Sequence, residues 1–139
     1  MKQRAPVSTI MSKELIALNR TDDLERAELL FKRHKIRHIP VVSGDVIIGM
    51  LSYTDLLRIS FADAVDESEK DVDTLVYNMF TIDQVMVKNV TTVDSQTSIK
   101  QVAKILAIKE FHALPVVDDG ILVGIVTTTD LINYLIDQY

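Results

Sequence analysis

The same pattern of eight residues occurs twice in this chain, first as Gly49-Met50-Leu51-Ser52-Tyr53-Thr54-Asp55-Leu56 and again, 75 positions later, as Gly124-Ile125-Val126-Thr127-Thr128-Thr129-Asp130-Leu131. The same shift places Pro40-Val41-Val42 over Pro115-Val116-Val117 and Met11 over Met86 without a gap. Chance similarity between two α/β segments would not align a proline, a glycine and a Thr-Asp pair in one register. The chain is therefore an internal duplication, and two copies are expected to form a closed, pseudo-twofold pair rather than a solenoid.

Each copy predicts the order strand, helix, strand, strand, helix. Short extended runs at residues 16–18 and 91–93 precede amphipathic helices, the first of which is expected to begin near Asp22 with Glu25 as its capping-box partner. Two β-rich runs joined by a turn follow, at 38–43 and 46–52 and at 114–118 and 121–127. A closing helix is expected from about residues 54 and 129. One such copy has too little core to be stable alone, so an α/β fold with the two copies packed sheet to sheet is expected.

The segment between the copies has a different composition. Residues 63–73 carry six acidic side chains and one basic one, which is typical of a solvated and mobile connector. Residues 75–80 are apolar again and are expected to form a short helix. The boundaries predicted from the sequence are a first repeat at 1–60, a linker at 61–81 and a second repeat at 82–139.

Composition excludes several classes of function. The chain has 139 residues, no cysteine and a formal net charge of -5, so it offers no disulfide, no thiolate metal site, no cysteine nucleophile and no basic face for nucleic acid. It contains neither a Gly-x-Ser-x-Gly elbow nor a phosphate-binding loop of the Gly-Lys-Ser/Thr type, so no enzyme activity is expected. The N-terminus lacks the apolar run of a signal peptide, and no stretch is long enough to span a bilayer. A cytoplasmic protein without a membrane partner is the expectation.

Three features, in the same order in both copies, resemble the CBS domain family in its tandem arrangement. Each copy opens with an apolar-x-x-apolar-Met run, at 7–11 and at 82–86, continues with an apolar-Pro-Val-Val strand entry, and ends with the Gly-apolar-apolar-Ser/Thr-x-x-Asp pattern. The resemblance covers nearly the whole chain apart from the linker and implies two βαββα repeats. The ACT-type ligand-binding domain, also built from small α/β repeats, gives no reason for the closing Ser/Thr-x-x-Asp.

The closing pattern also has a chemical meaning of its own. A strand ends at Ser52 or Thr127 and a helix starts within a few residues, so unpaired N–H groups and partial positive charge favour a bound anion there. At this turn a hydroxyl can hydrogen-bond to a phosphate, and a carboxylate can accept hydrogen bonds from the two hydroxyl groups of a sugar diol. Helix capping is the alternative, since serine, threonine and aspartate are all good N-terminal residues.

The resemblance implies a regulatory sensor that binds an adenosine-containing ligand in clefts between the repeats and needs no other cofactor. Asp55 and Asp130 would then bind the ribose hydroxyls, and Ser52 and Thr127 would contact phosphate or ribose, beside Thr54 and Thr129. The base would lie against the first-strand segments and the strand entries, namely Ile16, Ala17, Ile39 and Pro40 in the first copy and Thr91, Thr92, Leu114 and Pro115 in the second. AMP, ADP, ATP, S-adenosylmethionine, NAD and cyclic dinucleotides all share these contacts.

A basic cluster at residues 32–38 stands out in an acidic chain. Arg37 and His38 precede the motif proline and could reach a polyphosphate, as could Lys109 and His112 in the second copy. The alternative is a solvated helix C-terminus, where cations suit the helix dipole. His34 and His38 are four residues apart, but a helix end is expected between them, so no metal site is predicted.

The helices carry more apolar surface than one sheet needs. Residues 131, 132, 135 and 136 form a broad stripe on the last helix, and Ile105 and Ile108 are expected to project away from the core stripe of Ile99, Val102, Ala103 and Leu106. This predicts a homodimer through the helices, with residues 75–80 as the alternative cover. A ligand-free dimerising scaffold that regulates an unidentified protein by direct contact is the competing function.

Overall fold

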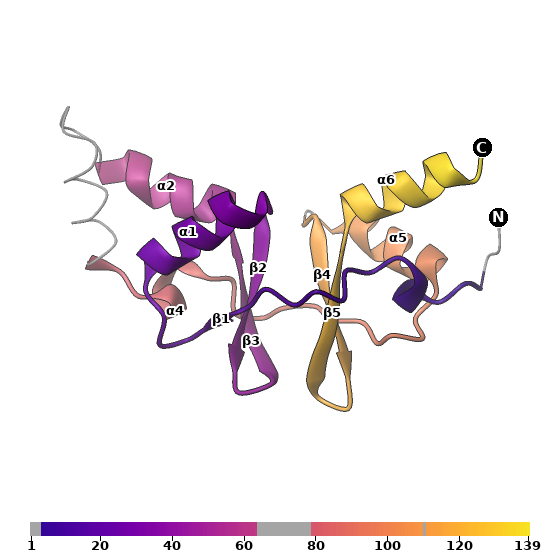
Figure 1. Cartoon of the computed structure of the whole chain (residues 1–139), viewed down its shortest axis with the longest axis horizontal. Coiled ribbons are helices and arrows are strands. Elements are labelled where there is room, and N and C mark those ends of the chain that lie inside the picture. Colours follow the sequence, from indigo (N-terminus) through magenta and orange to yellow (C-terminus); the bar gives the residue numbers. More distant parts are fainter. Residues whose placement is uncertain (1–3, 64–78, 110) are drawn as a thin grey trace. The chain divides into compact units, whose positions relative to one another are not determined.

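The computed structural model describes residues 4–63, 79–109 and 111–139, and the fold is mixed α/β, as the duplication predicts. The first copy contains strand β1 (Leu18–Asn19), helix α1 (Leu24–His34), strands β2 (His38–Ser43) and β3 (Val46–Ser52) and helix α2 (Tyr53–Asp63). Figure 1 shows these elements in chain order. The strands form a sheet in the order β1-β2-β3, with β1 parallel to β2. The order of elements expected for this copy is confirmed.

The second copy repeats this order with one difference. It contains helix α5 (Ile99–Ile108), the antiparallel strands β4 (Ala113–Asp118) and β5 (Ile121–Thr127), and helix α6 (Thr128–Asp137). The first strand, expected at 91–93, is reduced to one parallel bridge between Val93 and Val116. In the first copy the Arg20 amide still donates to the Val42 carbonyl (3.3 Å), whereas the equivalent Ser95 amide donates to the Asp118 carboxylate (2.9 Å). By accepting the Ser95 amide, the side chain of Asp118 therefore replaces the backbone hydrogen bond that would extend the parallel strand pairing in the second copy.

The start of α1 differs from the expectation by one residue. Asp23 is the N-cap, and its side chain accepts a hydrogen bond from the Arg26 amide at 2.8 Å. Asp22 instead accepts from the Asn19 amide at 2.8 Å and so closes the preceding turn. The expected capping box of Asp22 with Glu25 is therefore wrong, because Asp22 is already used by that turn.

The other helix ends follow the sequence more closely. Lys35 has a left-handed backbone (φ 53°) and stops α1 after His34, so His34 and His38 do not share a helix, as expected. Helices α2 and α6 begin at Tyr53 and Thr128, one residue earlier than predicted. The predicted mobile run at 63–73 lies, from residue 64 on, outside the described residues, and so does most of the predicted short helix at 75–80.

The chain divides into two compact units that do not coincide with the two copies. Unit 1 contains Met1–Leu15, Asp45–Ile47 and Val90–Tyr139, and unit 2 contains Ile16–Gly44 and Ile48–Asn89. Each unit therefore combines the body of one copy with the opening segment of the other. In unit 1 the opening segment is the 3-10 helix η1 (Val7–Thr9) with the residues around it, and in unit 2 it is the short helix α4 (Ile82–Val85).

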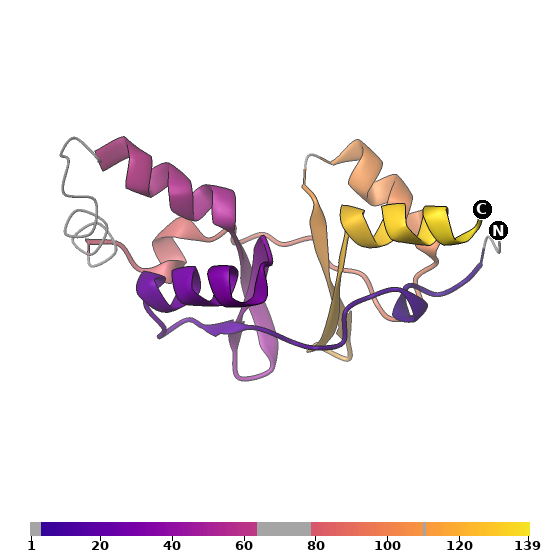
Figure 2. The same ribbon diagram turned by 45° about the horizontal axis from the view of Figure 1, so that its top comes forward.

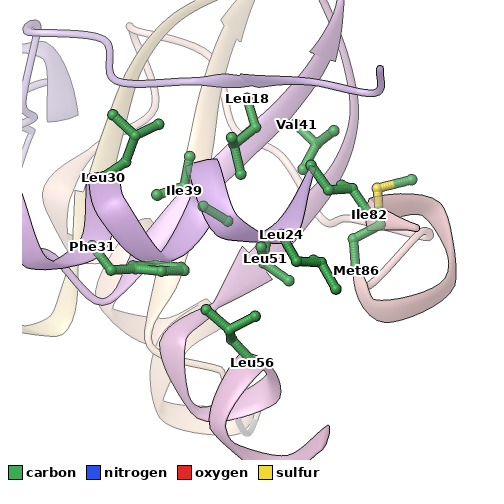
Figure 3. Packing of buried hydrophobic residues seen from close by; sticks show 11 residues of the cluster. Leu18, Leu24, Leu30, Phe31, Ile39, Val41, Leu51, Leu56, Ile82 and Met86 are labelled. Carbon is green, nitrogen blue, oxygen red and sulfur yellow. The ribbon is translucent and has the colours of Figure 1, made fainter. Parts of the chain in front are cut away.

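Burial and hydrogen bonds show this exchange of opening segments directly. Ile82 and Met86 belong to the core of unit 2 together with α1, β2, β3 and α2 (Figure 3). The residues of that core are Leu18, Leu24, Ala27, Leu30, Phe31, Ile39, Val41, Leu51, Leu56, Ile82 and Met86. In unit 1 the fully buried Val7 belongs to the core formed with Val93, Val102, Leu106, Leu114, Val116 and Val126.

The backbone pairing follows the same exchange. Met50 and Val87 exchange two hydrogen bonds, at 3.0 and 2.9 Å, and so attach the end of the second opening segment to β3. Ser12 and Ile125 exchange two in unit 1, at 2.8 and 3.1 Å, and attach the first opening segment to β5 (Figure 2). Both pairs are related by the shift of 75 that relates the two copies, so the exchange is reciprocal.

The closing helix α6 has no buried residue. Ile132, Leu135 and Ile136 are 56%, 46% and 62% exposed, and on α5 Ile108 is 79% exposed. Ile105 differs from the expectation, because it is half-buried and packs against the core of unit 1. This unit therefore exposes apolar side chains on α6 and at the last residue of α5, and also at Leu15, Val46, Ile121 and Tyr139.

Candidate functional site

In unit 2 the predicted ligand residues of the first copy gather at one end of the sheet. Because β1 and β2 are parallel, Ile16-Ala17, just ahead of β1, lie at the same end as Ile39-Pro40, near the start of β2. The Tyr53 amide donates to the Arg37 carbonyl at 2.9 Å, which joins the start of α2 to the start of β2. The closing motif and the strand entry therefore meet at one edge.

The first turn of α2 presents the polar groups of this edge. The Ser52 hydroxyl accepts a hydrogen bond from the Asp55 amide at 3.0 Å, so the capping interpretation holds for this hydroxyl. Oδ1 of Asp55 lies 3.3 Å from Nη1 of Arg58, one turn further along the helix. Asp55 and Ser52 are half-buried, whereas Thr54 is exposed. The carboxylate is thus held at the rim of the edge and close to a cation.

Unit 1 builds the same edge from the second copy. The Val93 amide donates to the Pro115 carbonyl at 3.1 Å, which sets Thr91-Thr92 beside the start of β4. The Thr128 amide donates to the His112 carbonyl at 2.9 Å and joins the start of α6 to the start of β4. This bond is the exact repeat, 75 residues on, of the bond between Tyr53 and Arg37. The duplication has therefore preserved the arrangement of backbone as well as the motif.

The first turn of α6 is closed by a capping box. The Thr127 hydroxyl accepts from the Asp130 amide at 3.2 Å, and Oδ2 of Asp130 accepts from the Thr127 amide at 2.9 Å. This pair of bonds fixes the rotamer of Asp130 and leaves its second oxygen for another donor. Capping and ligand binding are therefore compatible roles for this residue.

We name the two groups of predicted residues after their helices. The α2 half-site contains Ile16, Ala17, Arg37, His38, Ile39, Pro40, Ser52, Thr54 and Asp55. The α6 half-site contains Thr91, Thr92, His112, Leu114, Pro115, Thr127, Thr129 and Asp130.

Three of the four predicted cations lie at these half-sites. Arg37 and His112 are exposed and are placed by their own carbonyl groups, which accept the bonds from α2 and α6. His38 follows Arg37 as the half-buried first residue of β2. Lys109 is exposed and follows the last residue of α5, where its amide donates to the Ile105 carbonyl. Lys109 therefore belongs to the end of α5 and not to the α6 half-site.

Two further residues lie beside the α2 half-site and were not predicted. Tyr53 packs its ring against the buried Phe31 with 5.2 Å between centroids, so it anchors the start of α2 to α1. Arg58 lies beside Asp55, and the only sequence signal for it is the spacing of three residues between opposite charges on a helix. The equivalent positions in the second copy are Thr128 and Asn133.

This combination of groups has a definite chemical capability. In the first turn of each helix the amides of the first and third residues are already bonded, to a strand carbonyl and to the capping hydroxyl, so the amide of the second residue, Thr54 or Thr129, is the one of the three available to an anion. A carboxylate accepts hydrogen bonds from a pair of hydroxyl groups. Each half-site adds a strand entry whose side chains, Ile39 and Pro40 or Leu114 and Pro115, are buried, so a flat ring would meet backbone there rather than these side chains. A phosphorylated or otherwise substituted nucleoside presents all three kinds of group to such a surface.

The described residues lack two other kinds of site. No group of three or more His, Asp or Glu side chains there is placed to hold a metal ion. No helix in the same part of the chain has the length and apolar character that crossing a membrane requires.

Comparison with known proteins identifies the repeat unit. The CBS domain matches the chain twice, at residues 7–62 and 82–137. A CBS domain-containing protein of Dictyostelium discoideum is 28% identical over 133 residues, covering 94% of this chain and 90% of its own length. Protein MJ1225 of Methanocaldococcus jannaschii is 22% identical over 129 residues, but the chain spans only 46% of its length.

Solved structures show the same fold. AcuB from Vibrio cholerae superposes with a TM-score of 0.79 at 28% identity, covering 96% of this chain and 91% of its own. The CBS domain pair of protein MJ0100, solved in complex with 5'-methylthioadenosine and S-adenosyl-L-methionine, gives a TM-score of 0.79 at 25% identity and covers 97% and 98%. With two matches that together include most of the chain and both half-sites, this protein belongs to the CBS domain family as a tandem CBS pair.

Proposed function

We propose that this chain is a non-catalytic, cytoplasmic sensor that binds an adenosine-containing ligand at the α2 and α6 half-sites. One observation carries the proposal: each unit places a hydroxyl, a carboxylate and the start of a strand around a helix N-terminus, and the backbone bonds that do so recur with the shift of 75. A structure that only needed capped helices would not need the strand entries at the same edge.

The relatives support the chemical class of the ligand. The MJ0100 domain pair, 25% identical over nearly all of this chain, was solved with two adenosyl compounds. In the proposed complex, Asp55 and Asp130 accept the ribose hydroxyls, while Ser52 and Thr127, with Thr54 and Thr129 beside them, line the phosphate or ribose. Binding then favours one conformation of the chain, and through it one partner or assembly state, because a ligand shifts a population toward the state that it binds better.

Isothermal titration tests the proposal. The purified chain is titrated with adenosine, AMP, ATP and S-adenosylmethionine, and so are the variants Asp55→Ala and Asp130→Ala. Loss of a charged acceptor is expected to cost about 1.5–3 kcal/mol, or one to two decades in affinity, for the half-site concerned. Asp137→Ala, at the exposed end of α6, is the matched control and should bind as the unchanged chain does. A ligand whose affinity neither substitution lowers would place the site elsewhere.

One observation favours the second candidate, a ligand-free scaffold that acts by contact. Helix α6 has no buried residue and exposes three large apolar side chains. Under this alternative the capping bonds of Ser52, Thr127 and Asp130 are their whole role. A thermal-shift screen with the same compounds discriminates, because a ligand that binds the native state raises the melting temperature and a scaffold without a ligand shows no shift.

A further inference from the structure

The two half-sites differ in permanent charge at two equivalent positions. Arg58, beside Asp55, corresponds to Asn133 in the second copy, and Arg37 corresponds to His112. An arginine stays charged at any physiological pH, whereas a histidine side chain generally gains or loses its charge between about pH 5 and 8 and so is not a permanent cation. The α2 half-site therefore carries two positive charges that the α6 half-site lacks at these places.

Geometry connects both arginines with the group that would hold the ribose. Nη1 of Arg58 is 3.3 Å from Oδ1 of Asp55, and the Arg58 side chain is 72% exposed, so it can follow a ligand group. The Arg37 carbonyl is bonded to the Tyr53 amide, two residues ahead of Asp55. The Arg58 guanidinium thus contacts the carboxylate directly, and the backbone of Arg37, whose side chain is exposed, lies at the start of α2.

The charge of the carboxylate makes these cations important for selectivity. A carboxylate that accepts ribose hydroxyls also repels a phosphate attached to the same sugar. Arg58 offsets this repulsion in the α2 half-site, because an opposite charge within about 4 Å compensates much of the field of the carboxylate. In the α6 half-site one carboxylate oxygen of Asp130 accepts a hydrogen bond from the Thr127 amide, and the uncharged Asn133 occupies the position equivalent to Arg58.

We infer that the two half-sites select ligands of different charge, and this inference rests on the proposed function. The α2 half-site takes a phosphorylated adenosyl ligand, with Arg58 and Arg37 as its specificity-determining residues. The α6 half-site takes an uncharged or cationic adenosyl compound, such as a nucleoside or a sulfonium derivative. The chain would then report on two ligand pools through two copies of one motif.

The test exchanges the residues between the half-sites. Arg58→Asn and Arg37→His give the α2 half-site the residues of the α6 half-site, and Asn133→Arg and His112→Arg do the reverse. The affinity of each variant is measured for AMP, adenosine and S-adenosylmethionine. Variants of the α2 half-site also carry Asp130→Ala, which weakens the other half-site, and variants of the α6 half-site carry Asp55→Ala for the same reason. Each loss of arginine should lower the ratio of AMP to adenosine affinity by about two- to fivefold, and each gain should raise it by a similar factor.

The outcomes separate this inference from the function on which it rests. Equal AMP-to-adenosine ratios at both half-sites, unchanged by the exchanges, overturn the inference while ligand binding stands. If neither Asp55→Ala nor Asp130→Ala lowers the affinity for any ligand, the proposed function is wrong, and the inference is wrong with it. Amide chemical shifts in the unsubstituted chain give an independent answer, since AMP should perturb Tyr53–Asp55 first and S-adenosylmethionine should perturb Thr128–Asp130 first. The reverse order, or simultaneous shifts with both probes, contradicts the inference.

Discussion

The side chain of Met86 occupies the place where a Cβ atom on Gly49 would have to be. A Cβ built on Gly49 would lie 2.3 Å from the Met86 sulfur and 2.9 Å from the carbonyl oxygen of Val87. The equivalent pair behaves in the same way, since a Cβ on Gly124 would lie 2.6 Å from the sulfur of Met11. The methionine that opens one copy therefore requires the glycine in the body of the other, and the two motif positions form a single contact.

This contact predicts that Gly49→Ala destabilises the protein. An added methyl group in a packed position costs about 1–3 kcal/mol, and here both a sulfur and a backbone oxygen are in its way. Met86→Ala should cost about 2–5 kcal/mol by leaving a cavity. The double variant should lose less than the sum of the two, because removing the methionine makes room for the alanine. Urea unfolding of the four proteins measures this coupling, and additive losses would show that the two residues act separately.

A second prediction concerns the number of phosphates on the ligand. Arg37→Ala should weaken ATP binding more than adenosine binding, because an exposed guanidinium at the α2 half-site attracts the phosphates that adenosine lacks. Calorimetry with adenosine, AMP and ATP gives the ratios, with Arg33→Ala, exposed in the last turn of α1, as the control. An equal loss for ATP and adenosine would indicate a structural effect of the substitution.

A third prediction is a homodimer through α6. The exposed residues Ile132, Leu135 and Ile136 are the proposed contact, and a stable dimer should bury on the order of 800 Å² on each partner. Sedimentation equilibrium should give a dimer for the unsubstituted chain at micromolar concentration and a monomer for Ile136→Asp. Ile121→Asp, the same change at an exposed isoleucine of β5, should leave the dimer intact. An unsubstituted chain that sediments as a monomer refutes the prediction.

A fourth prediction follows from Asp118, whose pKa is lowered by hydrogen bonds from the side chain and the backbone N–H of Ser95. A pKa that is lower in the folded than in the unfolded chain stabilises the fold above the ordinary value of 3.8, and this stabilisation is lost as the pH falls through the lowered value. The unsubstituted chain should therefore be more stable than Asp118→Asn at pH 7, and the difference should vanish in acid.

Unfolding measured between pH 7 and about pH 2, below the lowered pKa, checks this, with Asp137→Asn at the exposed end of α6 as the control. A difference between the unsubstituted chain and Asp118→Asn that stays constant over this range would mean that the carboxylate charge has no part in the contact.

The duplication made most of the fold predictable. Local patterns predicted the strand entries at Pro40 and Pro115 and the helix starts after Ser52 and Thr127. Such patterns depend only on residues that are neighbours in the sequence, so they can be recognised without the structure. The shortened first strand of the second copy was not expected, because it depends on Asp118, a side chain more than 20 residues away from the amide of Ser95 that it binds. Competition between a side-chain carboxylate and a backbone carbonyl for one amide N–H produces no periodic pattern in the sequence, so it cannot be predicted from it.

The sequence predicted which residues lie at the two half-sites, but it predicted less well which neighbouring side chains they contact. Ser52, Asp55, Thr127 and Asp130 were identified from the repeated motif, and the structure places each pair at the start of a helix. The charge difference that Arg58 makes between the half-sites was missed, since opposite charges three residues apart are common on exposed helices. The run at Val7–Met11 was identified as the opening motif of the first copy, but the sequence did not predict that it packs against the body of the second copy, because an apolar pattern does not specify which surface covers it.

The exchanged opening segments also set an order for folding during synthesis. All the residues of unit 2 have been made once the ribosome has passed Asn89, so this unit can complete its core while the rest of the second copy is still absent. The first opening segment must wait, with Val7 and Met11 without their partners, until β5 emerges some 110 residues later. During synthesis Val7 and Met11 therefore stay without their partners after unit 2 has all of its residues, so this segment is an expected contact of a chaperone.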